Sequence, residues 1–278
     1  MEKRASRFNN VIFVLMIVLS IIFLAPIFIV LMNSFKGMFF ISDAPFAFPI
    51  AETFVGLKNY LKGIEKIGFI SAFGYSLFIT VFSVAAIVLF TSMTAWYITR
   101  VKSKLTSVIY YAFVFSMIVP FQMVMFPMSK IVNLMHLDNP VGLIVVYLGF
   151  GAGLSVFMFC GFIKSVPLEI EEAATIDGCS PLQTYFQVVF PILKPTAITV
   201  AILNAMWIWN DYLLPYLTIG NKYRTIPIAV QYLQGGYGSR DMGALMATLV
   251  MAIIPIVIFY LSCQKYIIKG VVAGAVKG

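Results

Sequence analysis

The sequence predicts an all-α membrane protein that crosses the bilayer several times. Hydrophobic residues make up 61% of the 278 positions and charged residues 11%, whereas a soluble domain has about 45–50% apolar and about 25% charged residues. The mean hydropathy is +0.97, and long segments carry no charge at all. So few charged side chains cannot cover a water-facing surface, which excludes an ordinary soluble enzyme, a disordered chain and a nucleic-acid-binding module.

Six uncharged or nearly uncharged segments are long enough to cross a membrane. A helix needs about 20 apolar residues to span a hydrocarbon core about 30 Å thick. We therefore expect six transmembrane helices, which lie at about 11–32, 70–98, 107–128, 141–163, 197–217 and 243–264. Pro120 and Pro127 can kink the third of these helices. The chain, 1–278, is expected to form a single membrane domain.

Lysine and arginine indicate the orientation of these helices. With the N-terminus in the cytoplasm, 11 of the 19 basic residues fall inside and 8 outside. The short loop that holds Arg100, Lys102 and Lys104 weighs most under the positive-inside rule. We therefore expect both termini in the cytoplasm, and we interpret the net charge of +8 as a signal of topology rather than as a site for a polyanion.

The predicted cytoplasmic loop at 164–195 is too polar to enter the bilayer. It holds four of the eleven acidic residues of the chain, namely Glu169, Glu171, Glu172 and Asp177. Ser165 and Pro167 are typical of the first turn of a helix, and Gly178 is typical of a left-handed C-terminal cap. The sequence therefore predicts a short helix that ends at a glycine-dependent bend.

A second short helix is predicted after this bend. Ser180, Pro181 and Gln183 form the pattern of a capping box with proline at the first helical position. This helix is expected to run towards Val189 and to stop before Pro191, so that the loop is a hairpin of two short helices.

The first helix of the hairpin has a narrow face of small side chains. Positions i, i+3, i+4 and i+7 are Ile170, Ala173, Ala174 and Asp177, flanked by Glu169 and Glu172. Small side chains let another backbone come close, and exposed carboxylates can pair with a basic partner. The pattern alone leaves two interpretations open: a docking surface, or a solvated hairpin with ordinary charges.

The spacing within this loop resembles the EAA motif of ABC importer permeases. That motif is Glu-Ala-Ala, three residues, Gly, nine residues and then Ile-x-Leu-Pro. Here Glu172-Ala173-Ala174 and Gly178 are followed at the same spacing by Val188-x-Phe190-Pro191. Val188 and Phe190 depart from the motif, and both are apolar.

The resemblance extends through the second half of the chain. The segments that carry it are Trp209–Pro215, Thr225–Pro227 and Lys269–Gly278, which are similar to segments of carbohydrate-uptake permeases. The first half matches only in its pattern of spans. The chain is identified as a member of the maltose-type permeases, as the smaller, six-span partner of a heterodimer.

This resemblance implies the type I ABC importer permease fold, with a cytoplasmic coupling helix that docks in a groove of a separate ATPase subunit. The implied contact residues are Glu172, Ala173, Ala174, Asp177 and Gly178. The implied partners are a homologous second permease, an ABC ATPase dimer that binds ATP and Mg, and an extracytoplasmic solute-binding protein. The chain itself has no GxxxxGK[ST] loop, so we expect neither an ATPase site nor a cofactor in it.

Two further segments acquire roles through the same resemblance. Gln234, Gly235, Gly236 and Tyr237 lie in a predicted outer loop that resembles the loop entering the sugar cleft of the binding protein; a simple turn is the alternative. The tail at 265–278 resembles a family tail that reaches into the ATPase dimer, and otherwise it is a flexible, positively charged end.

Candidates for the transport path come from the residues themselves. Asp211 is the only acidic residue inside a predicted span, and a charge at the bilayer centre costs about 2.5–3.5 kcal/mol on insertion scales. Asn210 and Tyr212 flank it, and amide, carboxylate and aromatic groups suit a sugar. An aromatic belt at the interface explains the aromatic residues equally well. Gln122, which follows Pro120, is a second candidate.

The expected function is therefore the import of a sugar, with an oligosaccharide preferred, by alternating access driven by ATP hydrolysis on separate subunits. The alternative is an ion-coupled secondary transporter of a small polar solute. That class favours inverted repeats and paired intramembrane ionisable residues, and neither is visible in the sequence. A membrane enzyme ranks third, because the sequence shows no nucleophile–base pair or metal-ligand cluster.

Overall fold

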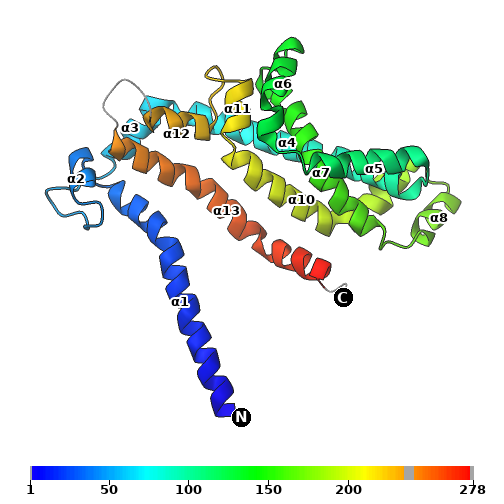
Figure 1. Cartoon of the computed structure of the whole chain (residues 1–278), viewed down its shortest axis with the longest axis horizontal. Coiled ribbons are helices and arrows are strands. Elements are labelled where there is room, and N and C mark those ends of the chain that lie inside the picture. Colours follow the sequence, from blue (N-terminus) through cyan, green and yellow to red (C-terminus); the bar gives the residue numbers. More distant parts are fainter. Residues whose placement is uncertain (1, 235–240, 276–278) are drawn as a thin grey trace. The chain divides into compact units, whose positions relative to one another are not determined.

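The computed structural model describes residues 2–234 and 241–275. Over these residues the chain is helical, and its strand pairing is limited to one isolated bridge between Lys36 and Phe54. The helices, labelled in Figure 1 except for α9 and η1, are α1 (Glu2–Asn33), α2 (Met38–Asp43), α3 (Lys58–Ile67), α4 (Phe69–Arg100), α5 (Lys104–Ser116), α6 (Phe121–Leu134), α7 (Pro140–Ile163), α8 (Glu169–Ile176), α9 (Pro181–Thr184), the π-helical turn η1 (Tyr185–Val189), α10 (Phe190–Asn210), α11 (Leu213–Thr218), α12 (Ile226–Gln234) and α13 (Met242–Ala275).

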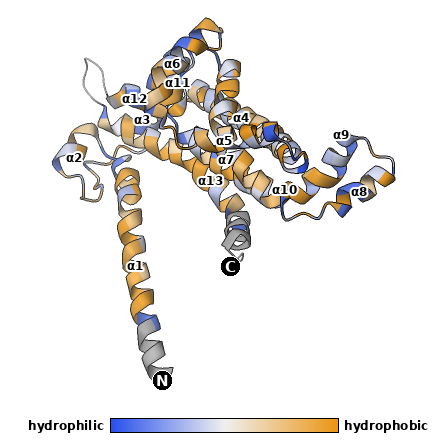
Figure 2. Ribbon diagram, turned by 45° about the vertical axis from the view of Figure 1, so that its right-hand side comes forward, coloured by the Kyte–Doolittle hydropathy of each residue, from blue (hydrophilic) through white to orange (hydrophobic). Residues whose placement is uncertain are grey.

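Five helical segments are long and apolar enough to cross a membrane. They are Asn9–Asn33, Phe69–Arg100, Pro140–Ile163, Pro181–Asn210 and Met242–Lys265. Figure 2 shows α10, and the part of α1 that is coloured, as largely hydrophobic. A sixth span results if α5 and α6 are counted together. The all-α, multi-pass membrane fold predicted from the sequence is therefore confirmed.

The third predicted span, 107–128, is not one continuous helix. It is divided into α5 and α6, which meet at a bend of 108°. Pro120 is the N-terminal cap of α6, with an extended backbone (φ −62°, ψ 136°). Proline lacks an N–H, and it pushes the preceding residue out of the helical region, so the chain turns sharply here. Pro127 is accommodated inside α6.

The fifth predicted span, 197–217, also differs from the observed helices. α10 begins at Phe190 and ends at Asn210, and Asp211 is extended (ψ 125°) before the short helix α11 begins. The Asp211 carboxylate accepts hydrogen bonds from the N–H groups of Leu213 and Leu214, at 3.1 and 3.4 Å. An Asp side chain that bonds the backbone in this way competes with the helix, and it starts a new helix rather than continuing the old one.

The structure divides into two compact units, residues 1–70 with 229–255, and residues 71–228 with 256–278. In the first unit, the buried Asn59 amide donates to the carbonyl oxygens of Ser34 and Lys36, both at 2.8 Å. A Cβ on Gly243 would lie 2.5 Å from Asn59 Oδ1. The start of α13 therefore packs closely on α3, and only a glycine fits there.

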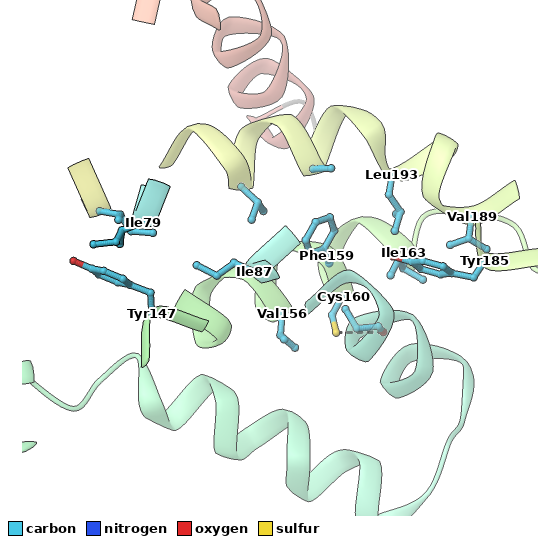
Figure 3. Close-up of a cluster of buried hydrophobic side chains, with 14 of the residues drawn as sticks. Ile79, Ile87, Tyr147, Val156, Phe159, Cys160, Ile163, Tyr185, Val189 and Leu193 are labelled. Carbon is cyan, nitrogen blue, oxygen red and sulfur yellow. Dashed lines mark hydrogen bonds between the residues drawn. The ribbon is translucent and has the colours of Figure 1, made fainter. Parts of the chain in front are cut away.

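In the second unit, α7 packs between α5 and α10. Figure 3 shows the buried core between α4, α7, η1 and α10, in which Ile87, Phe159 and Leu193 are fully buried. A Cβ on Gly151 of α7 would lie 2.6 Å from Ile87 and 2.8 Å from the Asn204 side chain. Glycine at this position therefore lets α4 and α10 approach α7 closely.

Candidate functional site

The loop at 164–195 contains a short helix that ends at the predicted glycine. α8 is capped at its C-terminus by Gly178, whose φ of +85° lies in the left-handed region. Gly178 N–H donates to the Thr175 carbonyl and Cys179 N–H to the Ala174 carbonyl, both at 3.0 Å. This hydrogen-bond pair defines a Schellman motif, so the predicted bend is confirmed.

The first turn of α8 differs from the prediction. The helix begins at Glu169 and has no side-chain N-cap. The Ser165 hydroxyl instead donates to the Phe162 carbonyl at 2.7 Å, at the end of α7. Ser165 is therefore occupied by the preceding helix, and neither it nor Pro167 lies in the first turn of α8.

The second helix of the hairpin has the predicted start but not the predicted end. Ser180 N–H donates to Gln183 Oε1 at 2.8 Å, and Gln183 N–H donates to Ser180 Oγ at 3.4 Å, so the capping box is confirmed. The helix then passes through Pro191 without stopping. The turn before it is π-helical, with Phe190 N–H bonded to the Tyr185 carbonyl five residues back. The wider turn accommodates the proline, and α9, η1 and α10 form one 30-residue segment.

An ion pair fixes α8 to the end of α4. Arg100 donates through Nε and Nη2 to Glu171 Oε1, at 2.8 and 2.6 Å. Trp96 Nε1 donates to Glu171 Oε2 at 2.8 Å, so both carboxylate oxygens are occupied. Arg100 also donates to the Val166 carbonyl at 3.1 Å. Because charge-assisted bonds from arginine fix orientation as well as distance, α8 is held against α4 in one geometry.

A second polar contact joins the hairpin to α4. The hydroxyl groups of Ser92 and Tyr185 are 2.6 Å apart, and the Tyr185 ring lies 5.5 Å from that of Trp96. Between α8, α9 and Trp96 the surface forms an open hollow of about 580 Å³. The hairpin is therefore attached to α4 through Tyr185, and a solvent-accessible hollow lies between its two helices and Trp96.

The five residues predicted to contact an ATPase do not all point the same way. Glu172, Ala173, Asp177 and Gly178 are exposed, whereas Ala174 is buried against the same chain. Glu171, which is not one of these five residues, is also buried. Glu171 and Ala174 are three residues apart and share the inward face of α8. The neighbouring sequence carries no signal for this role of Glu171, because its partners Trp96 and Arg100 lie on α4.

Asp211 lies where α10 gives way to α11. Its Oδ2 accepts a hydrogen bond from the hydroxyl of the fully buried Tyr147 at 3.1 Å. The Tyr147 ring makes an edge contact with Trp207 at 5.4 Å. Because Oδ1 binds two backbone N–H groups of α11, every oxygen of this carboxylate is satisfied within the chain. Asp211 therefore has a structural role in the break between the helices.

The other candidates for the path are more exposed. The Asn210 side chain is exposed and donates to the Met206 carbonyl at 2.7 Å, one turn back on α10. The rings of Tyr212 and Tyr216 are stacked with centroids 5.2 Å apart. Gln122 is exposed in the first turn of α6, and its side chain has no hydrogen bond to any described residue.

The predicted outer loop lies mostly outside the described residues. Gln234 is the last residue of α12, whereas Gly235, Gly236 and Tyr237 are not described. The chain resumes at Asp241, which caps α13 by accepting from Ala244 N–H at 3.1 Å. Asp241 also pairs with Lys66 of α3 at 2.7 Å. Of the predicted tail at 265–278, the structure continues α13 to Ala275, and 276–278 lie outside the described residues.

The electrostatic setting of Asp241 follows from these contacts. Burial alone would raise the pKa of its carboxyl, but the hydrogen bonds from Lys66 and from the Ala244 N–H outweigh burial, and the pKa is lowered. The carboxylate is therefore retained at neutral pH, where it holds the first turn of α13 to α3.

Comparison with solved structures identifies the class of fold. The chain resembles a chain in the crystal structure of a bacterial ABC transporter involved in the import of the acidic polysaccharide alginate, with a TM-score of 0.78 and 22% sequence identity. The similarity covers 94% of this chain and 96% of that chain. The helices and the α8–α9 hairpin thus have the fold of a type I ABC importer permease.

The sequence comparisons identify the family. Residues 87–272 match the binding-protein-dependent transport system inner membrane component family, and the chain belongs to this family. It is 42% identical to the "Probable starch degradation products transport system permease protein AmyC" of Thermoanaerobacterium thermosulfurigenes, over 94% of each chain. It is 38% identical to the multiple sugar-binding transport system permease protein MsmG of Streptococcus mutans, over 95% of this chain and 96% of that protein. The melibiose/raffinose/stachyose import permease protein MelC of Bacillus subtilis is 31% identical, over 81% of this chain and 82% of that protein.

Proposed function

We propose that this chain is the permease subunit of an ABC importer that carries an oligosaccharide across the bacterial cytoplasmic membrane. The relatives AmyC, MsmG and MelC are named for starch degradation products, for multiple sugars and for melibiose, raffinose and stachyose. A carbohydrate is common to all three names, and the sugars named for MelC are oligosaccharides. The aromatic and amide groups around Asp211 suit the same class of substrate.

The proposal that this chain couples ATP hydrolysis to transport rests on the attachment of α8 to α4. Its inward face is bound to α4 through Glu171 and Arg100, while Glu172, Ala173 and Asp177 remain exposed on its other side. A helix held in this way moves together with the elements to which it is attached. A rigid-body movement of an ATPase docked on the exposed side would therefore be transmitted to α4, and through the hairpin to α7 and α10. This link drives alternating access in the proposed mechanism.

The remaining parts of the machine lie on other chains. The proposed partners are a homologous second permease, an ATPase dimer and an extracytoplasmic binding protein. ATP and Mg are bound by the ATPase dimer, and this chain is not itself an enzyme and holds no cofactor. Both termini lie in the cytoplasm, so that α8 faces the ATPase and the outer loop containing Gln234–Tyr237 faces the binding protein. The tail after Lys265 reaches towards the ATPase dimer.

Within the membrane, we place the sugar path beside the break between α10 and α11. Asp211 positions this break, and Asn210 and Tyr212 on either side of it supply an amide and an aromatic face. Gln122, at the start of α6, is a separate polar group of the path. Asp211 holds the break through its hydrogen bonds to Tyr147 and to the first turn of α11, and it is a further polar group of the proposed path.

Reconstitution tests the proposed function against the ion-coupled alternative. Proteoliposomes with this chain, its second permease and the ATPase, supplied with binding protein and ATP, are expected to accumulate a labelled oligosaccharide. Liposomes with this polypeptide alone and an imposed proton or sodium gradient are expected to accumulate none. Gradient-driven uptake by the chain alone would contradict the proposal.

A further inference from the structure

A second hollow lies at the turn between α4 and α5, on the same side of the second unit as α8. It has a volume of about 880 Å³, and the last turn of α4, the first two turns of α5 and the end of α7 form its walls. Lys102, Lys104 and Lys164 line it together with Ser103 and Ser107. None of its lining residues is acidic, so every charged side chain that lines the hollow is positive.

The positive charge of this hollow is not neutralised within the described part of the chain. The nearby carboxylate of Glu171 is bound by Arg100 and Trp96. None of the three lysines forms an ion pair with a described residue. Lys164 lies over the Tyr110 ring, with Nζ 5.4 Å from its centroid. Three cations around one hollow repel one another, and an anion bound between them would relieve this repulsion.

The hollow also lies at a membrane boundary. α4 and α7 are both spanning segments, and they end at Arg100 and Ile163, directly beside the lysines. An exposed apolar stripe then runs from the hollow along α5. Its members recur at helical spacing and are Leu105, Val108, Tyr111 and Phe115, each 64–68% exposed. A ligand that fits both features has an anionic head and a long apolar tail.

We propose that this hollow binds the headgroup of an anionic phospholipid, with the phosphodiester between Lys102, Lys104 and Lys164 and the acyl chains along the α5 stripe. Basic pockets between membrane helices are suited to such headgroups. A soluble phosphate would use the lysines but not the apolar stripe. An acidic segment of a protein partner would likewise leave the stripe uncovered. The proposal requires only that the chain lies in a membrane, and it is independent of the transported substrate.

Lipid retention by the assembled transporter tests this proposal. The full complex is placed in nanodiscs of phosphatidylcholine with a minor fraction of phosphatidylglycerol, and bound phosphatidylglycerol is counted by native mass spectrometry after release. The test variant is Lys102→Gln/Lys104→Gln/Lys164→Gln. The matched control is Lys58→Gln/Lys130→Gln/Lys194→Gln, which removes the same charge from exposed lysines elsewhere. A third variant replaces the three pocket lysines by arginine.

A basic residue near an anionic surface contributes about fivefold to binding, so the pocket variant is expected to bind phosphatidylglycerol about a hundredfold more weakly. The control and the arginine variant are expected to retain it, and added inorganic phosphate is expected not to displace it. Equal retention by the pocket variant would overturn the proposal, as would equal loss in the control. Displacement by inorganic phosphate would show a soluble-anion site instead. Loss of the ATPase with lipid still bound would show a protein-docking surface.

Discussion

Arg100 at the end of α4 and Glu171 on α8 form an ion pair of 2.6 Å, with their side chains 18% and 10% exposed. Trp96 Nε1 binds the second oxygen of the same carboxylate. The pair is therefore largely removed from water, and it joins two segments that lie 71 residues apart in the sequence. The ion pair therefore attaches α8 directly to the end of α4, in addition to the chain connections that join α8 to its neighbours in sequence.

Replacing Glu171 by Gln is expected to uncouple transport from ATP hydrolysis. The amide cannot balance the guanidinium charge, and breaking one half of a largely buried pair costs about 3 kcal/mol. α8 would then move without carrying α4. We expect uptake by reconstituted vesicles to fall about tenfold or more while the complex still hydrolyses ATP. Glu169→Gln, which changes an exposed carboxylate on the same helix, is the control and should transport normally. Full uptake by Glu171→Gln would show that the pair does not transmit force.

Substitutions of Gly178 are expected to rank by their tolerance of a left-handed backbone. No atom lies within 4 Å of a Cβ built on this residue, so the cost comes from the φ of +85° and not from a clash. That cost is about 1–2 kcal/mol for an ordinary L-residue. We expect uptake to decrease in the order Gly, Asn, Ala, Val, and Gly178→Val to abolish it while membrane insertion stays intact. The measurements are uptake and the amount of chain in the membrane. Equal uptake by the Val and Asn variants would contradict this order.

Asp211→Ala is expected to destabilise the protein, whereas Asp211→Asn is expected to change its stability little. Asparagine can still accept from the α11 N–H groups and can bond the Tyr147 hydroxyl. Alanine removes the cap, at about 1 kcal/mol, and leaves a buried hydroxyl without its partner, at about 1–3 kcal/mol. The thermal midpoint of the purified complex should fall for the Ala variant only. If the Asn variant instead kept its stability but raised the KM for uptake, Asp211 would be a sugar ligand.

The pair between Asp241 and Lys66 predicts a pH dependence at the start of α13. The pKa of Asp241 is lower in the folded chain than its usual value. Its contribution to stability is therefore present above the unfolded pKa of about 3.9, and it is lost as the pH falls below that value towards the folded pKa. The protection factors of the amides in residues 242–245, that is, their exchange relative to an unstructured peptide at the same pH, should fall on acidification through this range. In Asp241→Asn the protection factors should already be lower at neutral pH and should change little with acidification. An unchanged pH profile in that variant would exclude the pair as the cause.

Features that depend on neighbouring residues could be predicted from the sequence. The bend at Gly178 and the capping box of Ser180 and Gln183 are local, and both are present in the structure. The role of Glu171 could not be predicted, because its partners Trp96 and Arg100 are 75 and 71 residues away. Without them, the small residue Ala174 was assigned to the outward face of α8, although the structure buries it.

The ends of the membrane helices are a second feature that could not be predicted from the sequence. Hydropathy located the spans, but it carries no information on where a helix breaks. The divisions at Pro120 and Asp211 come from a missing N–H and from a side-chain hydrogen bond within apolar segments. The helix continues past Pro191 because a π-helical turn precedes it, and no local sequence pattern predicts that turn. These breaks lie close to Gln122 and to Asn210 and Tyr212, the residues proposed for the sugar path.

Site-specific cross-linking tests most directly the central claim that the exposed side of α8 docks on the ATPase. A photoreactive amino acid is placed at Ala173, which is exposed on α8, and in a control at Leu134, which is exposed on α6. Membranes that contain the whole transporter are irradiated, and the products are identified by mass spectrometry. We predict that the probe at residue 173 links to the ATPase subunit and the probe at residue 134 does not. A transporter that is active with the probe at residue 173 and yields no ATPase product there would contradict the account.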